Sequence, residues 1–350
     1  MKKVIGTSLI ALTAVALTAC GGSDESQGSN GSPTKLVIST WGFSEDFFRE
    51  EVYAPFEEEH NVEIVLDVGN NAERLNKIRQ GTSNVDLVYL SDYYAQQAVN
   101  DDLFEEIDRS NIPNIEEIYE MAQAPLGEEY GPAYTIGQFG IAYNADEVAG
   151  EISSWADLWD TSLARSLTIP SITSTTGPMF LDAASKVAGE DTFNEDAAFA
   201  QVQDLSGNVV KEYSQTSDFI NMFAQGEIVG GPVMEMYVND LKEAVPSAVF
   251  VSPEEGGYAV MNTVNIVKGS ENKELAEQFI NYQLSHDIQE TTAKAKIDSP
   301  VNTSVELTEE EAEGITYGQD LVDSLNQLDM EFVNDESAKW IERWNQEIAN

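Results

Sequence analysis

The fold is decided by residues 36–90, in which three apolar runs alternate with helical segments. The runs are LVIST at residues 36–40, VEIVLDV at 62–68 and VDLVYL at 85–90. The first is typical of a buried strand, the second alternates with a period of two, and the third is the next strand. Helices are predicted between them, the second at residues 73–80. This βαβαβ order predicts a parallel sheet with right-handed crossovers.

Ligands of open parallel sheets bind at the carboxyl ends of the strands. Trp41 follows the first run, and Ser91, Asp92 and Tyr93 follow the third. An indole at such an edge can stack on a ligand or face a cation, and it can equally plug the edge of a lobe. Of Tyr93 and its neighbour Tyr94, one is expected to point to the cleft and the other into the core.

A second alternation of strands and helices follows an extended crossing segment, residues 134–144. Strands are expected at residues 166–169, near 209, at 228–233 and at 260–267. Helices are expected at residues 178–188, 195–205, 218–224, 274–284, 318–325 and 338–348. The chain from residue 35 onward exceeds the roughly 250–300 residues at which single cores stop growing, so two lobes are predicted.

The N-terminus predicts a lipoprotein signal peptide over residues 1–19. Two lysines precede the apolar run 4–17, which is too short to span a membrane comfortably, and LTAC at 17–20 resembles a lipobox. An ordinary signal peptide that happens to contain a cysteine is the alternative. Cys20 is the only cysteine, so no disulfide partner exists and lipidation is its natural use. Residues 20–35 are rich in Gly and Ser and predict a flexible tether.

The charge balance excludes two classes of partner. Sixty-two acidic side chains stand against 18 basic ones, for a net charge of −44. Binding to nucleic acid requires clustered Lys and Arg, and so does an electrostatic hold on anionic lipid. The acids are spread along the chain, which is typical of a solvated surface.

No motif supports catalysis. The chain lacks G-x-S-x-G, a phosphate-binding G-x-x-x-x-G-K-[ST] loop and G-x-G-x-x-G. Its two histidines, His60 and His286, lie in polar stretches, where a surface role is more typical than catalysis or metal binding. We therefore expect no enzyme, no cofactor and no metal site.

A run of hydroxyl residues lies between a predicted strand and a helix N-terminus: Ser171, Thr173, Ser174, Thr175 and Thr176. Hydroxyls and free N–H groups at such a position can hold an anionic or carbonyl oxygen. Capping of the helix is the alternative, but it needs only one hydroxyl. The number of hydroxyls favours a ligand site.

Several motifs together resemble the extracellular solute-binding proteins of ABC importers. They are the lipobox, the strand that ends in Trp41, SDYY at 91–94, SWADLW at 154–159, and Gly256-Gly257 before a crossing strand. The spermidine/putrescine-binding group is the nearest likeness. The resemblance implies two α/β lobes, each with a mostly parallel sheet flanked by helices, and a ligand cleft between them. It places lobe 1 at residues 36–136 plus 263–302 and lobe 2 at 137–262 plus 303–350.

The same resemblance implies that Trp41 and Tyr93 contact the ligand. Other positions depart from the polyamine pattern: the acids early in lobe 2 are replaced by PSIT at 170–173, and the W-M-D element is Val260-Met261-Asn262. Glu235, near Tyr237, or Asp92 is left to supply a carboxylate. A dication needs one at each end, because a buried unpaired ammonium is costly. The pocket is therefore expected to suit a ligand with one cationic part, or one whose oxyanion or amide meets hydroxyls.

The function expected from these features is capture of a small organic solute, polyamine-like or otherwise cationic or zwitterionic, and delivery to an ABC permease and its ATPase subunits. The protein is expected to be a monomer, lipid-anchored on the outer face of the cytoplasmic membrane or in the periplasm. Thiamine, an amino-phosphonate or ferric ion are alternative ligands. A surface lipoprotein that senses a ligand without transport is an alternative role.

Overall fold

The computed structural model describes residues 32–82 and 84–349. Cys20, the signal peptide at residues 1–19 and most of the tether lie outside these residues. Residues from Thr34 onward form one compact unit. Within the described ranges, no helix is both long enough and apolar enough to cross a membrane.

The described residues contain nine strands joined in a single sheet. They are β1 (Thr34–Thr40), β2 (Val62–Val68), β3 (Leu87–Ser91), β4 (Ala133–Asn144), β5 (Leu167–Pro170), β6 (Val209–Tyr213), β7 (Gly230–Met234), β8 (Ala248–Val251) and β9 (Tyr258–Ile266). The order is β2-β1-β3-β9-β4-β7-β5-β6, and β8 pairs with β4. All the strands predicted from the sequence are present, and β8 was not predicted.

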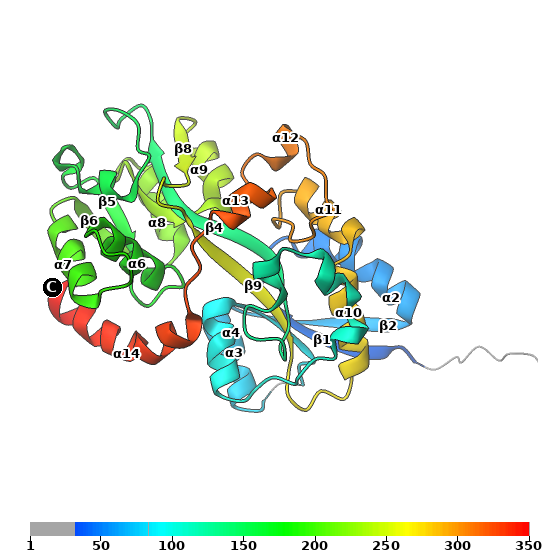
Figure 1. Ribbon diagram of the computed structural model, residues 1–350. Helices are drawn as coiled ribbons and strands as arrows, with labels where there is room; N and C mark the ends of the chain where they lie inside the picture. The colour runs from blue at the N-terminus through cyan, green and yellow to red at the C-terminus, as the bar shows by residue number, and fades with distance from the viewer. Residues whose placement is uncertain (1–31, 83, 350) are drawn as a thin grey trace, which may run out of the picture. The chain divides into compact units, whose positions relative to one another are not determined.

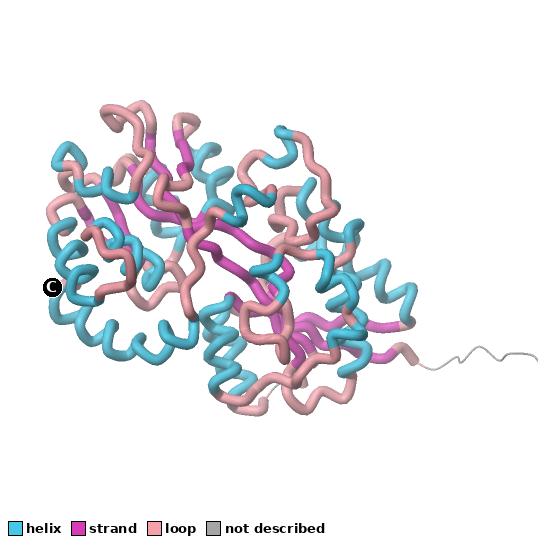
Figure 2. The backbone as a smooth tube through the Cα atoms, in the orientation of Figure 1, coloured by secondary structure: helices cyan, strands magenta, loops and turns pink. Residues whose placement is uncertain are grey.

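Helices flank the strands at both ends of this sheet (Figures 1 and 2). The longer ones are α2 (Ala54–His60), α3 (Asn71–Arg79), α4 (Asp92–Asn100), α6 (Gly177–Val187), α7 (Glu195–Leu205), α8 (Thr216–Ala224), α9 (Val238–Ala244), α10 (Lys273–Gln283), α11 (His286–Lys294) and α14 (Met330–Glu347). Shorter helices are α1 (Glu45–Phe47), α5 (Glu120–Gln123), α12 (Glu309–Ala312) and α13 (Gln319–Asp323). A π-helical turn, η1 (Phe48–Tyr53), joins α1 to α2, and the 3₁₀ turn η6 (Glu235–Tyr237) follows β7.

The predicted parallel βαβαβ unit is confirmed. β1 pairs in parallel with β2 and with β3, and β3 is buried along its whole length. Asn70 and Glu73 form a capping box that starts α3, since each side chain accepts a hydrogen bond from the other residue's N–H. The carboxyl ends of β1 and β3 therefore lie at the same edge of the sheet, with the start of α3 beside them.

The predicted crossing segments are β4 and β9, which lie side by side and antiparallel through the middle of the sheet (Figure 1). The first half of β4 pairs with β9, and its second half pairs with β7 and β8. Buried apolar residues form separate clusters on either side of these strands. Leu36, Phe56 and Phe279 belong to one cluster, and Trp155, Phe180 and Trp344 belong to another.

Candidate functional site

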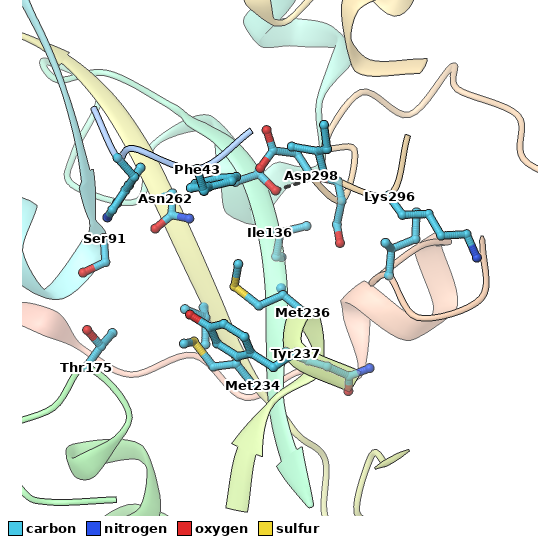
Figure 3. Close-up of a pocket in the computed structure, with 18 of the residues that line it drawn as sticks. Phe43, Ser91, Ile136, Thr175, Met234, Met236, Tyr237, Asn262, Lys296 and Asp298 are labelled. Carbon is cyan, nitrogen blue, oxygen red and sulfur yellow. Dashed lines mark hydrogen bonds between the residues drawn. The ribbon is translucent and has the colours of Figure 1, made fainter. Parts of the chain in front are cut away.

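A cavity of about 200 Å³ lies at the edge of the sheet where β1 and β3 end. Its volume is below the roughly 300–1,000 Å³ of pockets for drug-sized ligands, which indicates a small solute. The lining residues are Trp41, Phe43, Asn71, Ser91, Thr135, Ile136, Gly137, Gln138, Thr175, Met234, Met236, Tyr237, Val260, Asn262, Lys296, Ile297, Asp298, Ser299, Gly314 and Ile315. They come from segments far apart in the sequence, which the sheet brings together (Figure 3).

The floor of the cavity is set by strand register. Asn262 of β9 pairs with Ser91 on one side and with Thr135 of β4 on the other. Val260, two residues before Asn262, projects from the same face of β9 because side chains alternate along a strand. Three neighbouring strands therefore present a hydroxyl, an amide and a second hydroxyl to the same space.

Asp298 is the only carboxylic acid among the described residues that line the cavity. It is 8 % exposed, and no described residue donates a hydrogen bond to it. Burial alone raises the pKa of this carboxyl to about 7. Three buried phenols, Tyr53, Tyr89 and Tyr134, interact electrostatically with it, and burial raises the pKa of each of them. An ionised Asp298 thus lacks a counter-ion among the residues that the structure describes.

Two further buried polar atoms at the cavity lack a hydrogen-bond partner among the described residues: Oγ of Ser91 and Oε1 of Gln138. Ser91 is 4 % exposed and Gln138 3 %. An unsatisfied buried polar group costs about 1–3 kcal/mol, so native proteins leave few of them. Together with Asp298 they mark the cavity as a place where a ligand supplies the missing partners.

Lys296 is the only basic residue that lines the cavity within the described ranges, and its charge is directed elsewhere. Its Nζ donates to the backbone carbonyls of Glu310 (2.9 Å) and Glu313 (2.8 Å). Figure 3 shows the end of this side chain pointing away from Asp298. Lys296 therefore neutralises neither Asp298 nor an anionic ligand in this arrangement.

Trp41 lines the cavity and is half-buried. The guanidinium of Arg74 lies 4.3 Å from its ring centroid, and the Tyr89 ring lies parallel to it at 6.4 Å. Arg74 is fully buried, donates to the carbonyls of Ser39 and Tyr89 and to Asn71, and has a pKa lowered to about 10 by burial. The indole therefore has a structural contact as well as a cavity-facing position.

Apolar and sulfur-containing side chains fill the middle of the site. Met234 ends β7, and Met236 and Tyr237 belong to η6. Met236 is 48 % exposed and Phe43 39 %, which is unusual for large apolar residues. Methionine adapts its shape to the ligand because it is unbranched and flexible. These side chains are placed to cover the hydrocarbon part of a bound solute.

Most hydroxyl groups of residues 171–176 make their hydrogen bonds within their own turn. Ser174 Oγ donates to the carbonyl of Ser171 (2.8 Å) and accepts from the N–H of Gly177 (3.1 Å), while the Oγ atoms of Ser171 and Thr173 lie 3.1 Å apart. A Cβ on Gly177 would lie 2.3 Å from the Ser171 carbonyl, so glycine is needed for this close approach. Thr175 is the member of the run that lines the cavity.

Tyr93 and Asp92 do not line the cavity, which differs from the expected position. Helix α4 begins at Asp92, directly after β3, and no helix was predicted there from the sequence. The helix directs Tyr93 into the core of the other cluster, with its ring 5.2 Å from Tyr94. Asp92 is 2 % exposed and accepts a hydrogen bond from the N–H of Tyr93 (2.8 Å), and burial raises its pKa to about 7.

Glu235 does not line the cavity but accepts a hydrogen bond from Gln138, which does. One of its oxygens accepts from Nε2 of Gln138 (2.9 Å) and from Thr316 Oγ1 (2.7 Å), and burial raises its pKa. Glu235 thus orients Gln138, whose free Oε1 belongs to the cavity. Of the ten side chains expected to bind the ligand, Trp41, Thr175, Tyr237 and Asn262 line the cavity, and their contact with a ligand stays a prediction.

The described residues contain no group of three or more His, Cys, Asp or Glu side chains placed to hold a metal ion. His60 stacks on Phe56 with ring centroids 4.1 Å apart. Nδ1 of His286 lies 3.1 Å from Ser304 Oγ. Neither histidine lines the cavity.

The comparison with protein families decides the class of this protein. A family model described as bacterial extracellular solute-binding protein matches residues 82–323. The chain belongs to this family. Its members are named for binding a solute, and the two-lobed α/β fold expected from the sequence is confirmed for this solute-binding protein.

Named relatives place the protein near polyamine-binding proteins. It is 25 % identical over 300 residues, 81 % of each chain, to spermidine/putrescine-binding periplasmic protein 1 of Haemophilus influenzae. It is 26 % identical over 279 residues to the putrescine-binding periplasmic protein of Escherichia coli, covering 72 % of this chain and 74 % of the other. The crystal structure of an ABC transporter from Clostridium perfringens is 45 % identical, with a TM-score of 0.82, and covers 89 % of this chain and 99 % of that one.

Proposed function

We propose that this solute-binding protein is a lipid-anchored component of an ABC importer that captures a small organic cation and delivers it to the permease. The anchor is the lipidated thiol of Cys20, followed by the tether at residues 20–35. Lipobox and tether support the anchor, and the family supports solute capture. Lipidation holds a protein at the membrane without a spanning helix.

The observation that carries this proposal is the buried carboxyl of Asp298, to which no described residue donates a hydrogen bond. A buried ionised carboxylate without a counter-ion is costly, and an incoming cation removes that cost. The curated relatives are named for binding spermidine and putrescine, which are amines. A cationic solute, polyamine-like or with a single amine, therefore fits both the cavity and the relatives.

Delivery requires that the importer distinguish the loaded protein from the empty one. We propose that the lobes, residues 36–136 plus 263–302 and residues 137–262 plus 303–350, close around the solute as the monomer binds it. Residues from both proposed lobes line the cavity, for example Trp41 from the first lobe and Tyr237 from the second. The exposed Phe43 and Met236 would be covered on closure.

A thermal-shift screen of the mature chain from Cys20 onward tests the binding part. The panel contains polyamines, monoamines, thiamine and its phosphates, amino-phosphonates, amino acids and ferric ion. A solute present at about 100 times its Kd stabilises the folded state by roughly 2.7 kcal/mol, which raises Tm measurably. A shift with amines, lost in Asp298→Asn, is expected. No shift with any cation would contradict the proposal.

Uptake tests the transport part. Cells that lack the gene are expected to lose uptake of the identified solute and to regain it when the full-length chain is restored. Normal uptake in the deletion strain, with binding intact in the purified protein, would favour a sensor that binds without transport.

A further inference from the structure

We infer that the cavity selects a solute with one ammonium group and, at its other end, an uncharged hydrogen-bonding group, in preference to a diamine or a zwitterion. The inference rests on the proposed function and names the class of solute. It follows from the positions of the charged side chains around the cavity and from the part of the cavity that has no charged side chain.

One end of the cavity carries Asp298, the only carboxyl among the described residues that line it. Asp298 is nine-tenths buried, faces the cavity and has no donor among the described residues. An ammonium group here gains a charge-assisted hydrogen bond and compensates the buried carboxylate. The neighbouring phenols Tyr53, Tyr89 and Tyr134 stay neutral in the physiological range, because burial raises the pKa of each. They offer no competing charge.

The other end is polar but uncharged. Figure 3 shows Asp298 and Thr175 on opposite sides of the view, with Ile136 and Met236 between them and with Ser91 and Asn262 along one side. Ser91 Oγ lacks a hydrogen-bond partner among the described residues, and the amide of Asn262 also lines the cavity. A hydroxyl or amide can both donate to and accept from such groups, so it satisfies them without bringing a charge.

The remaining nearby acids are not available to a second ammonium. One oxygen of Glu235 accepts hydrogen bonds from Gln138 and Thr316, and Glu235 does not line the cavity. Asp92 is buried and accepts the N–H of Tyr93. A diamine would therefore place one ammonium where no carboxylate meets it, at a cost of desolvation.

The positive charges near the cavity disfavour a dication and give a carboxylate no partner. Arg74 is buried against Trp41, and although Asp67 attracts its charge, the two make no ion pair within the described residues, so this positive charge opposes a second ammonium at that side. Its Nη atoms are engaged by carbonyls and by Asn71. Lys296 is engaged by two carbonyls. Nε of Arg74 has no partner among the described residues, but Arg74 does not line the cavity. A ligand carboxylate thus finds no free cationic donor among the described lining residues.

Three four-carbon compounds separate these possibilities, because they differ only at one end: aminobutanol, putrescine and γ-aminobutyrate. Their Kd values are measured by calorimetry on the mature chain at pH 8, where Asp298 is ionised. Aminobutanol is expected to bind at least about tenfold more tightly than either of the others, since a buried unpaired charge is costly. Asp298→Asn is expected to weaken aminobutanol binding at least about 30-fold.

Glu212→Gln is the control, because it also removes a carboxyl whose pKa is raised by burial, but a half-buried one that accepts from Trp344 outside the cavity. It should leave the Kd for aminobutanol unchanged. Tighter binding of putrescine or γ-aminobutyrate than of aminobutanol would overturn the inference and leave the proposed function standing. Equal affinity of wild-type protein and Asp298→Asn for aminobutanol would also overturn it, and absence of binding by all three would do the same.

Discussion

The guanidinium of Arg74 lies 4.3 Å from the ring centroid of Trp41, and it is a buried cation that makes no ion pair with any described residue. The sequence left two roles open for Trp41, stacking on a ligand and plugging the edge of a lobe. The contact with Arg74 is structural, and the position at the cavity is where a ligand would meet the ring. The two roles are separable, because one affects stability and the other affects affinity.

Trp41→Ala is expected to weaken solute binding by more than about tenfold, since the ring supplies contact area at the cavity. It should also lower the free energy of unfolding by about 1–3 kcal/mol, because Arg74 loses its aromatic partner. Calorimetry and chemical denaturation measure the two effects. Trp41→Phe retains a ring and is expected to recover part of both. An unchanged Kd together with reduced stability would leave Trp41 with a structural role alone.

Replacing Cys20 by Ser removes the thiol that we propose is lipidated. The variant is expected to appear in the medium or the soluble extracytoplasmic fraction, while the wild-type chain stays with membranes, because the proposed lipid on Cys20 is the attachment that the substitution removes. Fractionation and immunoblotting measure the distribution. Membrane retention of the Ser variant would contradict lipid anchoring at this residue.

The sheet was predictable because its signals are local and strong. The apolar runs at residues 36–40, 62–68 and 85–90 correspond to β1, β2 and β3, and the crossing segment 134–144 corresponds to β4. The rule that ligands meet the carboxyl ends of parallel strands led to Trp41, and Ser91 from the second end it singled out also lines the cavity. These results depend on the periodicity of the apolar residues and on the order of the strands, and both can be read from a single sequence.

Asp298 could not be predicted as a site residue, because it differs from the other acidic residues in its burial and not in its residue type. It is one of 62 acidic residues, and nothing in the sequence around it separates it from the solvated ones. Tyr93 was expected at the cleft because it follows the third strand and because of the family resemblance, and helix α4, which starts at Asp92, directs its ring into the core instead. Tertiary environment decides both cases, and a single sequence does not contain it.

Asn262→Asp is expected to improve putrescine binding at least about tenfold, because it adds a carboxylate on the cavity wall away from Asp298 and gives a second ammonium its partner. Binding of aminobutanol should weaken or stay the same. Calorimetry with both compounds measures the change in preference.

Asn281→Asp is the matched control for this gain. Asn281 lies outside the cavity and accepts the N–H of Asn114 through Oδ1, which an aspartate can also do. The control adds the same charge to the protein and should leave the affinity for putrescine unchanged. An equal gain in both variants would show that net charge, and not the position of the carboxylate, determines diamine affinity.

Solute affinity is expected to depend on pH through Asp298. Burial raises the pKa of this carboxyl to about 7, so below pH 7 the empty site is protonated and an ammonium must displace that proton. The amine itself stays charged over this range. Affinity should therefore rise with pH by up to about tenfold per unit below pH 7 and level off above it. Calorimetry between pH 5 and pH 9 measures the slope.

The empty protein should show the opposite trend in stability. An acid whose pKa is higher in the folded state than the ordinary 3.8 stabilises the fold at low pH, and this contribution is lost as pH rises toward 7. Asp298→Asn is therefore expected to have a higher Tm than wild type at pH 8 and a similar Tm at pH 4. Its solute affinity should lose most of the pH dependence. Asp92, with a pKa of about 7, titrates in both proteins, so the difference between them isolates Asp298. Identical pH profiles of affinity in both proteins would exclude Asp298 as the titrating group that meets the solute.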